Sequence, residues 1–249
     1  MISALALERL PEIEPGYDLA AGIVSALAPD RLQAGDVIVI AHKAVSKSEG
    51  RLRALGDVTP GERALAIAAE QDRDPRHVQV ILDEARSVVR AERGILITET
   101  RHGYVCANSG VDASNVPGED VVVMLPLDPD GSARRLRARL RQMAGVAPGV
   151  IITDSFGRAW RTGQCDVAIG CAGISPVEDL RGEQDIHGRE LRATVIAVAD
   201  ELAAAADLCR SKAGRQPVIL LRGAERHVTA HDGPGAAALV RPEEQDLFR

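Results

Sequence analysis

The sequence predicts a mixed α+β fold for this chain of 249 residues, and three observations lead to that prediction. Short apolar runs of strand length alternate with amphipathic segments of helical period. Long polar stretches separate several strands, where a regular doubly wound sheet would have helical crossovers. The length suits one large domain or two small ones. A weak boundary near residues 145–150 predicts two intertwined regions, 1–148 and 149–249.

Apolar runs predict strands in the first half of the chain, at 36–41, 94–99, 104–107 and 120–124. The second and third of these flank a short polar turn and are expected to pair. Thr59 is placed to cap a helix, in a capping box with Glu62. Asp74 precedes a proline and predicts the start of another helix. The arginine-rich segment 130–145 predicts an amphipathic helix whose basic face is solvated.

The second half begins with a predicted strand at 149–154 that ends in polar residues. The stretch that follows, up to residue 190, is dense in Asp, Arg, Gly and Gln, with one apolar insert at 167–169. From 190 to 212, apolar residues recur at steps of three or four and predict one long helix. A last buried strand is expected at 217–221.

Composition excludes several classes of protein. The net charge of −6 argues against a general polyanion binder, and one Trp, two Tyr and two Phe are too few for stacking on single-stranded nucleic acid. No apolar run reaches the ~18 residues of a membrane span. The N-terminus lacks the pattern of a signal peptide. The four cysteines form no C-x-x-C pair and are expected to be free thiols. We therefore expect a soluble, cytoplasmic protein that binds neither nucleic acid nor membrane.

Two polar clusters follow predicted strands in the first half. The segment 42–51 carries His42, Lys43 and Lys47, which are well placed to meet phosphate or carboxylate oxygens, although an ordinary basic loop has the same composition. Asp112 and Asn115 lie in a Gly/Ser-rich loop. Their oxygens suit a hard cation bound with nucleotide phosphates, but such residues also form loops for local reasons.

The third cluster, 153–189, is the strongest. Asp154 and Ser155 offer oxygen ligands at the carboxyl end of a strand, and Arg158 and Arg161 offer planar forks for phosphate or carboxylate. Arg158 or Arg161 could instead form a structural ion pair with Asp166 or Asp179. The sequence contains neither common phosphate-binding loop. Together the clusters predict metal-assisted phosphoryl chemistry on an anionic substrate.

At these clusters the sequence resembles the coenzyme F420 γ-glutamyl ligase family. The shared motifs are L-P-E-I, K-x-V-S-K-x-E-G-R, E-T-R-H-G-x-V-C-A-N-x-G-V-D-x-S-N-V, I-T-D-S-x-G-R-x-W-R-x-G-Q-x-D-x-A-I-G and R-P-x-E-x-D-L-F-R, which begin at Leu10, Lys43, Glu99, Ile152 and Arg241. The resemblance covers essentially the whole chain.

The resemblance implies a homodimeric, GTP-dependent ligase with a two-domain α+β fold. Such enzymes add one or more γ-linked L-glutamates to the lactyl-phosphate side chain of a deazaflavin coenzyme precursor. GTP would phosphorylate the acceptor carboxylate, and the glutamate amine would then attack the acyl phosphate. The implied cofactors are two divalent cations, Mg²⁺ or Mn²⁺, with K⁺ as a further candidate ion.

The family's functional residues map onto this sequence position by position. The metal ligands would be Asp112 and Asp154, with Ser155 at the second ion. Lys212 departs from the family pattern, since a protonated lysine cannot replace a Gln ligand. The nucleotide contacts would be Leu10, Pro11, Glu12, Ile13, His42, Lys47, Asn115, Ser211 and Lys212.

Two other functions stay open. A repurposed relative would bind nucleotide or deazaflavin without ligation. A metal-dependent phosphohydrolase would release phosphate without glutamate.

Overall fold

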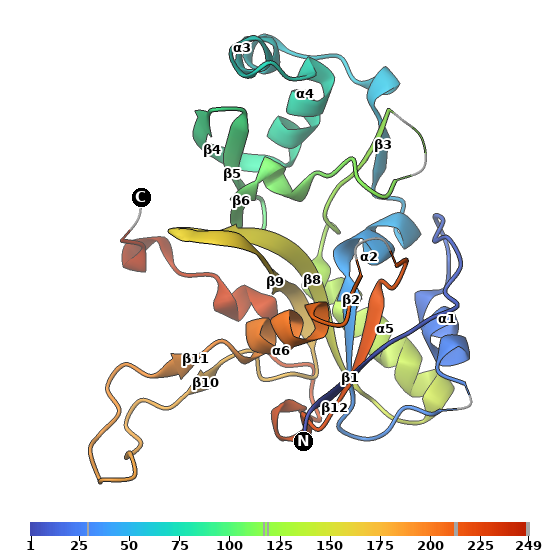
Figure 1. Cartoon of the computed structure of the whole chain (residues 1–249), viewed down its shortest axis with the longest axis vertical. Coiled ribbons are helices and arrows are strands. Elements are labelled where there is room, and N and C mark those ends of the chain that lie inside the picture. Colours follow the sequence, from blue (N-terminus) through green and yellow to red (C-terminus); the bar gives the residue numbers. More distant parts are fainter. Residues whose placement is uncertain (29, 117, 119, 212–213, 248–249) are drawn as a thin grey trace.

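The protein is built around a five-stranded mixed sheet, seen in the lower half of Figure 1. The computed structural model describes residues 1–28, 30–116, 118, 120–211 and 214–247. The strands of this sheet are β1 Ser3–Ala6, β2 Val37–Ala41, β8 Gly149–Arg158, β9 Arg161–Ala172 and β12 Val218–Arg222. They lie in the order β1-β12-β2-β8-β9. Only β2 and β8 run parallel, and the other neighbours are antiparallel.

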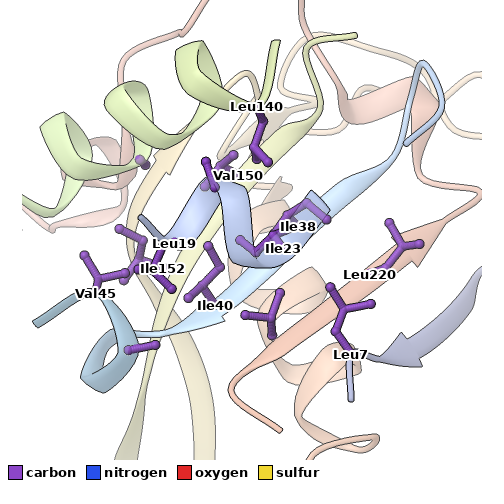
Figure 2. Packing of buried hydrophobic residues seen from close by; sticks show 14 of the residues in the cluster. Leu7, Leu19, Ile23, Ile38, Ile40, Val45, Leu140, Val150, Ile152 and Leu220 are labelled. Carbon is purple, nitrogen blue, oxygen red and sulfur yellow. The ribbon is translucent and has the colours of Figure 1, made fainter. Parts of the chain in front are cut away.

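Helices cover both faces of this sheet, because its central strands are apolar on both faces. Residues 37–40 of β2 are completely buried. Ile38 and Ile40 point toward the helices of one face (Figure 2), and Val37 and Val39 point to the other. The helices on the first face are α1 Leu19–Ala26, α2 His42–Ser48 and α5 Pro129–Ala144. The second face is covered by α6 Val198–Asp207.

A third hydrophobic cluster, besides the two on the faces of this sheet, lies in the part of the chain between α2 and α5, at the top of Figure 1. Its core includes Val78, Ile81 and Leu96. The antiparallel sheet β4-β5-β6 and the pair β3-β7 frame it. The elements are β3 Leu52–Ala54, α3 Glu62–Gln71, α4 Pro75–Glu84, β4 Ala85–Glu92, β5 Ile95–Thr100, β6 Val105–Ala107 and β7 Val121–Val123.

The strands β8 and β9 form a hairpin that runs past the rest of the sheet. Its tip is at 159–160, where Trp160 has a positive φ of 57° and is 82% exposed. A second projection, at the lower left of Figure 1, contains the short pair β10 Glu178–Asp179 and β11 Val195–Ile196. Short 3-10 turns complete the chain: η1 Leu55–Asp57, η2 Asn108–Gly110, η3 Glu225–His227, η4 Ala236–Leu239 and η5 Glu243–Gln245.

The mixed α+β class is confirmed, and every predicted strand is present. The central sheet takes strands from both sides of residue 148, and the division at that residue stays a prediction, as does the homodimer. No helix in the described part of the chain combines the length and apolarity that a membrane crossing needs.

Three details of the prediction were wrong. The helix expected over 190–212 is limited to α6, because 195–196 pair with β10 as a strand. Thr59 does not cap α3; Gly61 is its N-cap, and the Gly61 amide donates to Gln79 Oε1 of α4 at 2.8 Å. The polar stretch after residue 154 continues as strand, because it pairs with β9 up to Arg158.

Candidate functional site

Two of the polar clusters meet where β2 ends beside the middle of β8. These strands are parallel, with Ala41 paired to Thr153, so the residues that follow each of them lie side by side. His42 Nε2 is 3.3 Å from Asp154 Oδ1. The His42 side chain is almost fully buried, while that of Asp154 is 17% exposed. The carboxyl ends of parallel strands are the common place for ligand binding in open sheets.

The loop that contains Asp112 contacts the first turn of α2, the turn that also carries His42. Lys43 Nζ is 2.6 Å from Asp112 Oδ2 and donates to Ser114 Oγ at 2.7 Å. Backbone hydrogen bonds between Asp112 and Val123 hold the loop in place. Burial alone would raise the pKa of the Asp112 carboxyl, but the Lys43 ammonium and the Ser114 amide outweigh it and lower that pKa. Asp112 is therefore a carboxylate at neutral pH.

The segment 10–13 is tied to the middle of α2. Lys47 is buried, and its ammonium pairs with Glu12 Oε1 at 2.5 Å. Ile13 is buried in the main core and anchors the segment. The structure thus places His42 and Lys47 of the predicted nucleotide contacts on one short helix and brings Glu12 against it.

Ser155 points to the opposite face of β8 and donates its hydroxyl to Asp166 Oδ1 at 2.6 Å. Thr153 donates to Asp166 Oδ2 at 2.7 Å, and Arg210 pairs with the same carboxylate. Asp166 is 1% exposed. Sequence reasoning missed the role of Arg210, which fixes the chain just before Ser211. The place of Asp166 opposite Ser155 follows from the hairpin register, which the structure shows.

Two predicted nucleotide residues are exposed at the margin of this site. Asn115, with a φ of 55°, directly follows the Ser114 that Lys43 contacts. Ser211 is exposed after α6, and Lys212 lies outside the described residues.

Arg158 and Arg161 lie on either side of the hairpin tip and are exposed. Arg158 is four residues beyond Asp154 on an extended strand, roughly 13 Å away. The arginines are thus not beside the predicted metal ligands. The alternative of an ion pair with Asp166 or Asp179 is wrong for the described part of the chain, since those carboxylates pair with Arg210 and Arg181.

A thiol adjoins the carboxylate of Asp154. Burial, reinforced by the charge of Asp154, raises the pKa of Cys106 to about 12. A thiol with this pKa stays protonated at neutral pH and is a poor nucleophile. The chemistry of the site therefore depends on carboxylates, hydroxyls and ammonium groups.

The donor set fits a divalent cation that is bound together with phosphate. In the described ranges no three His, Cys, Asp or Glu side chains are close enough to hold a metal by themselves. Mg²⁺, however, is usually bound by one or two carboxylates plus substrate phosphates and water. Asp112 and Asp154 are two carboxylates of this kind in the site. Asp112 already contacts a cationic group, the Lys43 ammonium, and Asp154 is partly open to solvent.

The fold and the site define an α+β protein whose acidic and basic side chains gather where the parallel pairing of β2 with β8 ends. The chain belongs to the F420-0:gamma-glutamyl ligase family, whose model matches residues 8–223. The resemblance found in the sequence is thereby confirmed.

Full-length relatives agree with this assignment. The chain is 45% identical to the coenzyme F420:L-glutamate ligase of Methanopyrus kandleri, covering all of this chain and 97% of that protein. It is 43% identical to the protein of the same name from Methanothermobacter thermautotrophicus, with 100% and 99% coverage. It is 42% identical to that from Haloarcula marismortui, with 100% and 96% coverage.

Proposed function

We propose that this protein is a ligase of coenzyme F420 biosynthesis that joins L-glutamate, one or more by γ-links, to the deazaflavin precursor. The observation that carries the proposal is the convergence of Asp154 and Asp112 on neighbouring residues of α2, His42 and Lys43. Family membership and the names of the full-length relatives support it.

The proposed reaction uses GTP, because a carboxylate is a poor acyl donor until its oxygen becomes a good leaving group. The γ-phosphoryl group passes to the acceptor carboxylate, and GDP leaves. The amine of glutamate then attacks the carbonyl carbon, an amide forms, and phosphate leaves. Lys43 and Lys47 supply positive charge beside the transferred group, and Glu12 and Asp112 hold these ammonium groups in place.

Asp112 and Asp154 would hold divalent cations, with Ser155 at the second one. The Ser155 hydroxyl donates its hydrogen bond to Asp166, which leaves the hydroxyl lone pairs available to a ligand. Bound Mg²⁺ or Mn²⁺ would neutralise charge on the phosphates and orient the in-line transfer. We further propose that K⁺ is an additional ion of the site, that the protein is a homodimer and that it is located in the cytoplasm.

The test is GDP release from GTP with the deazaflavin precursor and glutamate supplied together and singly. A ligase releases GDP fastest when both are present and forms a product whose mass is higher by one or more glutamyl units. Phosphate release without glutamate would favour a phosphohydrolase. Tight nucleotide or deazaflavin binding without turnover would favour a repurposed binding protein.

GTP is expected to be preferred over ATP. This prediction rests on the family match alone, since backbone groups could read the base. The measurement is kcat/KM for both nucleotides at saturating precursor and glutamate. Equal values would show that the family's base recognition is absent from this chain.

Arg161→Lys is expected to raise the KM for the precursor while leaving thermal stability and GTP affinity nearly unchanged. The change keeps the charge but removes the planar fork that binds phosphate or carboxylate through two hydrogen bonds. Arg158→Lys tests the other side of the tip. Arg181→Lys is the matched control, because Arg181 is an exposed arginine paired with Asp179 in the β10–β11 projection. A Tm several degrees lower with an unaltered KM for the precursor would show that Arg161 has a structural role and does not bind substrate.

A further inference from the structure

A cavity of about 310 Å³ lies beside the β8–β9 hairpin and has no role in the function proposed so far. Its wall contains Phe156 of β8 and Val167 of β9. Phe156 is two residues from Asp154, so both side chains point to the same face of β8. Val167 is the cross-strand partner of Asp154. The cavity therefore begins next to the carboxylate at the centre of the proposed site.

The walls are mainly apolar and aromatic. Tyr104 is held in place because its hydroxyl donates to the Ile169 carbonyl at 2.6 Å. The rings of Tyr104 and Phe156 meet edge to face, with centroids 6.3 Å apart and an interplanar angle of 65°. Val240, from the C-terminal segment, lines the cavity as well. Walls of this kind suit a flat ring better than a small charged molecule.

Polar groups are confined to a few positions around the cavity. Asp200 of α6 accepts a hydrogen bond from the Ala168 amide at 2.9 Å. Burial raises the pKa of the Asp200 carboxyl. Arg241 is exposed at the cavity and begins the C-terminal motif R-P-x-E-x-D, to which neither the nucleotide nor the metal roles assign a task. A guanidinium can donate to the carbonyls of a heterocycle, and a carboxyl oxygen can accept from its N–H groups.

We propose that this cavity binds the planar deazaflavin ring of the acceptor substrate, with the carboxylate end of that substrate extending along β8 toward Asp154. The inference rests on the proposed function, because it assigns a place to that function's acceptor. The reacting carboxylate of the precursor lies at the end of a side chain, so the ring must bind some distance from the phosphoryl transfer. The shared face of Asp154 and Phe156 provides such a path.

Direct binding tests the proposal without turnover. The probes are the complete precursor and its ring fragment, the ribityl deazaflavin that lacks phosphate and lactate, measured by equilibrium dialysis with ring absorbance. Val240→Trp fills the cavity from a wall away from the metal ligands. It is expected to weaken binding of both probes by tenfold or more, with the Kd for GTP changed less than twofold. Val89→Trp, on the exposed part of β4, is the matched control and should bind both probes normally.

A second variant keeps the test decisive if Val240→Trp fails to fold. Arg241→Ala, at an exposed position, is expected to weaken ring-fragment binding several-fold without lowering the Tm. Unchanged affinity in both folded variants, with wild-type ligation intact, would overturn the cavity assignment and leave the ligase function standing. A raised KM for glutamate with normal ring binding would overturn it in favour of an amino-acid site. A wild type that binds neither probe and forms no product would overturn both proposals.

Discussion

Asp154→Asn is expected to lower turnover by roughly 100-fold or more with the fold intact. A neutral amide leaves the charge of a divalent ion uncompensated and weakens polarisation of the phosphates. Asp112→Asn should act in the same direction, because Asp112 also holds Lys43. The measurement is kcat for GDP release over a titration of Mg²⁺ and of Mn²⁺, with both variants requiring more metal for half-maximal rate.

The control for these variants is Asp179→Asn, an exposed aspartate paired with Arg181 away from the site. It should match the wild type in rate and in metal dependence. Near-native turnover in folded Asp154→Asn and Asp112→Asn would remove both residues from the metal site.

Asp166→Ala is expected to lower the free energy of unfolding by about 3 kcal/mol, the low end of the cost of removing one partner from a buried ion pair. The loss would appear as a Tm roughly 6–12 °C lower for a chain of this size. Removing the carboxylate takes the buried partner from the Arg210 guanidinium, whose side chain is only 10% exposed, and leaves it the longer contact with Asp207 at 3.7 Å. It also removes the acceptor of the Thr153 and Ser155 hydroxyls.

Chemical denaturation and thermal melting of the variant would check this value. The control is Asp179→Ala, since an exposed pair contributes only about 0–1 kcal/mol. A double variant, Asp166→Leu with Arg210→Met, should recover part of the loss, because apolar residues of similar volume replace buried pairs well. A loss below about 1 kcal/mol for Asp166→Ala would show that water already reaches the pair.

The sequence by itself determined most of the elements of this protein and the types of donor group in its candidate site. Fully apolar runs such as 37–40 are typical of strands buried on both faces, and their length and β-branched residues set them apart from helices. The Asp74-Pro75 pair marked the start of α4 because both residues act locally. The types of donor at 42–47, 112 and 154 predicted an anion and metal site, since charge and ligand softness belong to the side chains themselves.

The tertiary structure alone decided which of these groups meet. The parallel pairing of β2 with β8 joins His42 to Asp154 across 112 residues of chain, and no local pattern encodes that pairing. Pairing with β10 overrode the helical period at 195–196, because a strand partner outweighs a weak intrinsic preference. The hairpin register buried Asp166 against Arg210 and placed Arg158 away from the predicted metal ligands. Such contacts depend on long-range packing, which spacing along the sequence does not record.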